Sequence, residues 1–249
     1  MLGKIIVVTS GKGGAGKSSV CAGLGTALSE RGRRVLLVDM DISLRSLDLI
    51  LGIGNRAVFD WGDLINKRIK DKSCLLPVDG LPNLFVLPAP VKLEYNFNLF
   101  EIRKMFKAIA GEFDYVFMDS PAGVGRGFDM AVLPASSALI VTTPDPICVR
   151  SAGKVSRILD SRSITDQRLI INRFSADPIK YGRLPDVDEV IDGTAVRLIG
   201  IVPEDKNVIY AGANGQPLPE RSMARQAFRR VAARLENEQI RLKRLEKMR

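Results

Sequence analysis

The residues most clearly equipped for chemistry lie in one glycine-rich stretch near the start of the chain. Residues 11–18 read Gly-Lys-Gly-Gly-Ala-Gly-Lys-Ser and fit the pattern G-x-x-x-x-G-K-[ST]. Glycines let the backbone curl until successive N–H groups point at one anion, and the helix that follows adds its positive dipole end. The pattern therefore predicts a nucleotide phosphate site, in which Lys17 reaches the β- and γ-phosphates and the Ser18 hydroxyl binds Mg²⁺. The residues expected to contact the nucleotide here are Gly11, Gly13, Gly14, Ala15, Gly16, Lys17, Ser18 and Ser19.

Two apolar runs further along the chain end in acidic residues. Residues 35–38 are followed by Asp39 and Asp41, and residues 115–118 are followed by Asp119. A carboxylate at the end of a strand beside a phosphate loop suits a Mg²⁺ site, and Asp119 is the better candidate to hold the metal through water, with Asp39 the second. Asp41 could orient the water that attacks the γ-phosphate. Any one of these acids alone could simply cap a loop or a helix, but their position beside one phosphate loop favours chemistry.

The composition excludes several other kinds of chemistry. The 249-residue chain has no histidine, which removes imidazole acid/base catalysis, Ser–His–Asp triads and imidazole metal sites. Cys21, Cys74 and Cys148 form no C-x-x-C pair, so we expect free thiols in a reducing cytoplasm and no cysteine metal site. No apolar run approaches the roughly 18 to 20 residues of a membrane span, and the N-terminus reads as a strand and not as a signal peptide.

Elements that could position these residues follow from the hydrophobic pattern. The expected strands are residues 5–9, 35–38, 84–87, 115–118, 138–142, 169–171 and 198–202. The expected helices between them are residues 18–31, 97–110, 147–160 and 186–191. This alternation predicts an α/β fold with a mostly parallel twisted sheet and helices on both faces, and such sheets bind ligands at the carboxyl ends of their strands. The length fits one large domain, expected over residues 1–220.

The end of the chain differs in charge from the rest. Residues 221–249 carry ten Lys/Arg and three Asp/Glu, a net of +7 out of +9 for the whole chain. Apolar residues at three-and-four spacing predict a helix over residues 222–247, so residues 221–249 are expected to form a basic helix or tail packed on, or extending from, the domain. The sequence leaves three roles open for it: contact with acidic lipid, contact with nucleic acid, or a solvated basic face.

Several features together carry a family resemblance. Lys12 inside the loop, the D-x-D turn at residues 39–41 and the Asp-Ser-Pro-Ala-Gly segment at 119–123 resemble the MinD/ParA family of deviant Walker A P-loop ATPases. Residues 39–49, of the form D-x-D-I-x-L-R-x-L-D-L, are most similar to its septum-site-determining branch. The resemblance spans most of residues 1–55, 114–160 and 197–219.

The resemblance implies ATP and Mg²⁺ as cofactors, a homodimer formed on ATP, and hydrolysis that is slow without a partner. Lys12 would reach the phosphates of the second subunit, Asp41 would position the attacking water, and Asp119 would hold the metal through water. Asn172 matches the position that reads the adenine edge, with Pro203 completing the base pocket. The implied role is spatial regulation of cell division by a cytoplasmic protein associated with the inner face of the cell membrane, together with a protein activator or division-inhibitor partner.

Two related functions remain as alternatives. The basic end of the chain and a pI near 9.6 also suit a ParA-like partitioning ATPase that binds DNA non-specifically, and a flagellar-placement ATPase of the same family is a further candidate. Proteins of the septum-site branch usually end in an amphipathic helix with bulky apolar residues. Here the apolar arc of Leu235, Leu242, Leu245 and Met248 is interrupted by Arg241 and Arg249.

Overall fold

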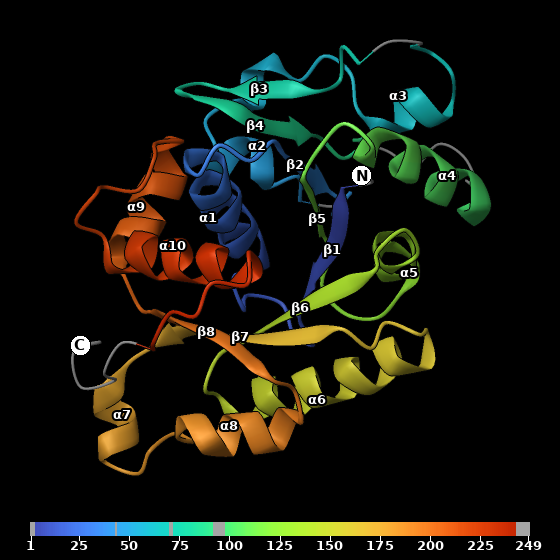
Figure 1. The fold of residues 1–249 in the computed structure, drawn as a ribbon. Helices are drawn as coiled ribbons and strands as arrows, with labels where there is room; N and C mark the ends of the chain where they lie inside the picture. Colours follow the sequence, from blue (N-terminus) through green and yellow to red (C-terminus); the bar gives the residue numbers. More distant parts are fainter. Residues whose placement is uncertain (1–2, 43, 70–71, 92–97, 243–249) are drawn as a thin grey trace.

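One eight-stranded sheet organises the molecule in the computed structural model, which describes residues 3–42, 44–69, 72–91 and 98–242 (Figure 1). The strands are β1 (Lys4–Thr9), β2 (Val35–Asp39), β3 (Leu76–Val78), β4 (Leu81–Leu87), β5 (Tyr115–Asp119), β6 (Ser137–Thr142), β7 (Gln167–Phe174) and β8 (Leu198–Pro203). Their order is β3-β4-β2-β5-β1-β6-β7-β8, and every pairing except β3–β4 is parallel. The predicted mostly parallel α/β sheet is confirmed.

Helices cover both faces of the sheet, because its strands are apolar on both sides. In β1, Ile5 and Val7 belong to one buried cluster, whereas Ile6 and Val8 belong to the other. Figure 1 shows α1 and α10 over one face and α4, α5, α6 and α8 over the other. The helices are α1 (Lys17–Glu30), α2 (Leu47–Ile50), η1 (Gly54–Arg56), α3 (Trp61–Ile65), α4 (Leu99–Ala110), α5 (Arg126–Val132), α6 (Pro146–Ser161), α7 (Ala176–Lys180), α8 (Val187–Thr194), α9 (Lys206–Asn214) and α10 (Met223–Leu235).

The elements that the sequence pattern missed are short or lie at an edge. All seven expected strands are present, but β3 was not expected, since Pro77 at its centre lacks an N–H and is tolerated only on an edge strand. The additional helices α2, α3, α5, α7 and α9 have at most nine residues, too few for a clear period of 3.6. The three cysteines are buried free thiols, as predicted.

The predicted helix over residues 222–247 is wrong for residues 236–242, and residues 243–247 lie outside the described residues. Helix α10 ends at Leu235, and Asn237 then takes a left-handed φ of 65°. Glu236 forms ion pairs with both Arg31 and Arg33 and so holds the following chain against the end of α1. An apolar arc that depends on continuous helix therefore does not form through Leu242, while Leu245, Met248 and Arg249 lie outside the described residues.

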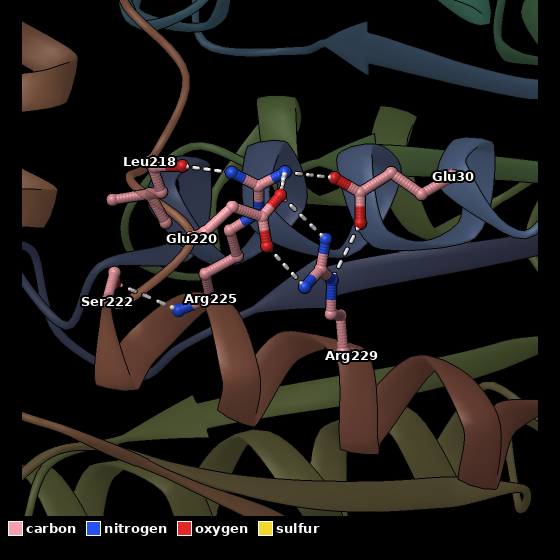
Figure 2. A network of polar contacts seen from close by, with 6 residues as sticks. All are labelled: Glu30, Leu218, Glu220, Ser222, Arg225 and Arg229. Atoms are coloured by element: carbon pink, nitrogen blue, oxygen red, sulfur yellow. Dashed lines mark hydrogen bonds and ion pairs between the residues drawn. The ribbon is translucent and has the colours of Figure 1, made fainter.

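Helix α10 is fastened to α1 by packing and by charge. A Cβ on Gly23 would lie 2.3 Å from the ring of Phe228, so only glycine allows the two helices to approach this closely. Arg225 and Arg229 reach Glu30 of α1 at 2.6 and 2.8 Å, and both also pair with Glu220 (Figure 2). Part of the positive charge expected at the end of the chain is thus neutralised within the fold. The division at residue 220 stays a prediction.

Candidate nucleotide-binding site

The glycine-rich loop connects β1 to α1 and is held by polar contacts of its own. Gly14 and Gly16 have φ of 80° and 91°, in the left-handed region where glycine is strongly favoured. The buried Lys17 donates through Nζ to the Ser10 hydroxyl at 3.3 Å, and that hydroxyl donates to the carbonyl of Lys12 at 2.8 Å. The loop therefore has the curled backbone that phosphate binding requires, with Lys17 aligned along its inner side.

Replacement of Gly16 by alanine is expected to weaken Mg²⁺–ADP binding at least tenfold. Its Cβ would lie 2.3 Å from Nδ2 of Asn172, so the loop or the asparagine must move. Gly32 is a matched control, because its φ of 79° is equally left-handed but a Cβ there meets nothing within 4 Å. Both variants should lose about 1–2 kcal/mol of stability from backbone strain. Calorimetric titration with Mg²⁺–ADP should separate them, and equal affinities would contradict a role for the Gly16–Asn172 contact.

Asp39 and Asp119 lie side by side in register on β2 and β5, but their surroundings differ. The carboxylate of Asp39 accepts hydrogen bonds from the backbone N–H groups of Asp41 at 2.9 Å, Ser46 at 2.9 Å and Leu47 at 3.1 Å. Burial raises the pKa of Asp39 to about 6, although these hydrogen bonds oppose the rise. The side chain expected as a second metal candidate is thus used to fold the segment that follows β2.

Asp119 has the opposite environment. It is completely buried, and neither carboxylate oxygen has a hydrogen-bond partner within the part of the chain that the structure describes. Burial, and next the negative charge of Asp39, raise the pKa of Asp119 to about 7 against the opposing effects of Ser18 and Lys17. A buried carboxylate without donors is costly unless a cation approaches it. The oxygen donors of Asp119 and Ser18 therefore fit Mg²⁺, which prefers such ligands.

The remaining phosphate-side residues lie at the outer edge of the same site. Asp41 is partly buried in the turn that Asp39 holds, and its carbonyl accepts from the N–H of Arg45 at 3.0 Å. Lys12 is exposed on the loop, and its charge adds to the backbone N–H groups that lower the pKa of Asp145 at the start of α6. The fold thus places Asp41 beside the metal candidates and leaves Lys12 on the surface.

A cleft of about 530 Å³ beside the loop contains the two predicted base-pocket residues, Asn172 and Pro203. The Nδ2 of Asn172 donates to the carbonyl of Ala15 at 2.8 Å, which joins this cleft to the phosphate loop. Sequence reasoning missed other residues of its lining, although they lie at the end of β7 or in the segments that follow β7 and β8, where a parallel sheet binds ligands. These additional residues include Arg173, Phe174, Lys206, Val208 and Ile209.

A parallel sheet with a phosphate loop after its first strand, a cation site and an adjoining base cleft defines the class of P-loop nucleotide-binding proteins. Residues 6–218 match the model of the CobQ/CobB/MinD/ParA nucleotide binding domain. Septum site-determining protein MinD of Synechocystis is 38% identical over 243 residues, covering 96% of this chain and 91% of the relative. The chain therefore belongs to the MinD/ParA family of nucleotide-binding ATPases, in its septum-site-determining MinD branch.

Solved structures agree with this assignment. MinD in a MinC:MinD cell division protein complex from Aquifex aeolicus has a TM-score of 0.91 at 38% identity and covers 97% of this chain and 98% of its own. MinD of Pyrococcus horikoshii, complexed with Mg-ADP, has a TM-score of 0.84 at 28% identity and covers 94% of this chain and 96% of its own. The expected family, its nucleotide and Mg²⁺ cofactors, and its place in septum site determination are confirmed.

Proposed function

We propose that this protein hydrolyses ATP in a homodimer that forms on ATP, with Lys12 of each subunit reaching the phosphates held by the other. The observation that carries the proposal is the position of Lys12, an exposed lysine on a loop that already has the buried Lys17 for its own phosphates. Sedimentation of the protein with and without ATP tests it, because a monomer in ATP would leave Lys12 without its proposed target.

The surface around Lys12 supports an interface. Large apolar side chains are exposed in the segments that follow β2, β5, β6 and β8, which all leave the sheet at the edge of the phosphate loop. They include Leu44, Leu49, Val124, Ile147, Ile209 and Tyr210, whose exposed fractions run from 43% to 74%. Exposed apolar side chains on segments that share one edge of a sheet are available for a protein–protein contact. We call these six residues the apolar rim.

Each polar residue of the site then has a role in phosphoryl transfer. Lys17 and the loop amides orient the phosphates, Asp41 orients the attacking water, and Ser18 and Asp119 hold the metal, the latter through water. Mg²⁺ supplies charge neutralisation on the phosphate oxygens. Lys12, delivered only on dimerisation, adds positive charge as an arginine finger does, so hydrolysis is slow in the monomer and without a protein partner.

We further propose that the partner is a division inhibitor or an activator of hydrolysis that binds the dimer. The Aquifex MinD that resembles this chain was solved with MinC, which supports a partner of that kind. A partner that recognises only the ATP form would bind across the two subunits of the proposed dimer.

Attachment to the inner face of the cell membrane is the last part of the proposal. Within the described residues no helix has the length and apolarity needed to cross a membrane. In the basic stretch, Arg225 and Arg229 are paired with acids, and Arg234 donates to the carbonyls of Ile199 and Ile240. Basic residues beyond residue 240 are proposed to meet anionic lipid, each worth about 1 kcal/mol, and two tails in a dimer would add their affinities.

Removal of residues 236–249 is expected to abolish pelleting of the ATP-bound protein with anionic liposomes while leaving Mg²⁺–ADP binding unchanged. The double variant Glu236→Ala/Glu238→Ala is the matched control, since it breaks the ion pairs with Arg31 and keeps every basic residue. It should still pellet. Full pelleting of the truncated protein would refute attachment through the tail. Pelleting with duplex DNA and not with liposomes would favour the ParA-like alternative.

A further inference from the structure

The hydroxyl of Ser46 contacts the hydroxyl of Ser18 although 28 residues separate them in the sequence. Ser46 donates through Oγ to Oγ of Ser18 at 2.9 Å. Ser46 is also the N-cap residue of α2, where a serine side chain normally accepts a hydrogen bond from the first turn of its own helix. It makes no such bond here. The hydroxyl is used toward the phosphate loop and not toward its own helix.

The segment before α2 is built to place Ser46 at that point. The backbone N–H of Ser46 donates to the buried carboxylate of Asp39 at 2.9 Å, which fixes the residue next to the end of β2. Arg45, directly before it, has a φ of 41°, an uncommon conformation for a residue with a side chain. An ion pair between Arg45 and the buried Asp48 at 2.9 Å holds this turn. The turn that carries Ser46 is thus fixed by the hydrogen bond to Asp39 and by the ion pair between Arg45 and Asp48, and in this turn the Ser46 hydroxyl contacts Ser18.

We propose that Ser46 is a positioning residue for the metal site, because its hydroxyl fixes the orientation of the Ser18 hydroxyl. A serine hydroxyl has one proton and two acceptor lone pairs. Ser46 fills one lone pair of Ser18. The second lone pair of the Ser18 hydroxyl remains for Mg²⁺, and its orientation is set by the contact with Ser46. Without Ser46 the Ser18 hydroxyl is free to rotate. Ordering it on metal binding then makes the free energy of Mg²⁺ binding less favourable.

The test measures metal dependence and not turnover. ADP affinity is determined by calorimetry in EDTA and at increasing Mg²⁺, with ADP used so that neither dimerisation nor hydrolysis contributes. Ser46→Ala is expected to raise the Mg²⁺ concentration at half-effect roughly threefold to tenfold, as expected for loss of one side-chain hydrogen bond, and to leave affinity in EDTA unchanged. Ser46→Thr keeps the hydroxyl and should restore the wild-type value. Ser136→Ala, which removes a hydroxyl that donates to the carbonyl of Ile5, is the control and should behave as wild type.

An unchanged Mg²⁺ dependence in Ser46→Ala would overturn the proposal. So would an equal loss of affinity in EDTA and in Mg²⁺, which would assign Ser46 to loop structure alone. Failure of Ser46→Thr to restore the wild-type value would also overturn it. The inference rests on the proposed metal role of Ser18, so Ser18→Ala is measured beside it. If Ser18→Ala removes the Mg²⁺ effect while Ser46→Ala does not change it, only the role of Ser46 fails. If Ser18→Ala has no effect, both fail.

Discussion

Replacing Lys12 with alanine is expected to leave a folded monomer that binds Mg²⁺–ADP normally but neither dimerises on ATP nor hydrolyses it at a useful rate. Lys12 is exposed, so its loss removes no buried contact and should change stability by less than about 0.5 kcal/mol. Lys17 binds the phosphates of the nucleotide held in the same subunit, so the affinity of the monomer for ADP should be unchanged. Charge delivered across an interface is worth on the order of 10³-fold or more in phosphoryl transfer, and the loss should be of that order.

Sedimentation velocity in ATP and a phosphate-release assay measure the two parts of this expectation. Lys154→Ala is the matched control, because it removes the same charge from an exposed position within α6, away from the strand ends. It should dimerise and hydrolyse ATP as wild type does. Dimer formation by Lys12→Ala that equals wild type would show that the lysine does not act across an interface.

Replacing Asp119 with asparagine is expected to stabilise the metal-free protein and to remove the effect of Mg²⁺ on nucleotide affinity. Its two oxygens are buried without a partner in the described residues, so the ionised side chain is costly until a cation arrives. The folded pKa of about 7 lies above the unfolded value of about 3.9. The contribution of Asp119 to stability in EDTA should therefore be greatest below pH 4 and fall as the pH rises toward 7, by a few kcal/mol at about 1.4 kcal/mol per pKa unit. Asparagine cannot ionise, so the variant loses this component of the pH dependence.

Thermal unfolding of the wild-type protein and of Asp119→Asn is measured in EDTA between pH 5 and pH 8, and again in Mg²⁺–ADP. The first series tests the pH dependence of stability, and the second tests the response to Mg²⁺. Asp79→Asn serves as the control, since Asp79 is an exposed acid paired with Arg56 and should alter neither measurement appreciably. A pH profile of Asp119→Asn that matches wild type, or an intact response to Mg²⁺, would contradict the assignment of this carboxylate to the metal.

Much of the site could be predicted because its signals are local in the sequence. A phosphate loop needs glycines, a lysine and a hydroxyl at fixed spacing directly after a strand, so residues 11–18 were recognisable without a structure. Strand ends that share one edge of a parallel sheet also bring Asp39, Asp41 and Asp119 together once their strands are identified. The end of α10 was predicted wrongly for the converse reason. Its helical pattern continues in the sequence, but ion pairs from Glu236 to Arg31 and Arg33, some 200 residues away, hold the chain after Leu235 out of the helical path.

The sequence by itself determined that this protein folds as an α/β domain, binds a nucleotide through residues 11–18 and has a second lysine, Lys12, in that loop. The sequence ranked Asp119 above Asp39 as a metal candidate, but only the tertiary structure gave the physical basis for that ranking. In the fold Asp39 accepts three backbone N–H groups, whereas Asp119 accepts no hydrogen bond from the described chain. The physical reason is that a carboxylate's role depends on its donors and its burial, and these come from segments distant in sequence. Ser46 reaches Ser18 in the same way, through a contact that no spacing in the sequence records.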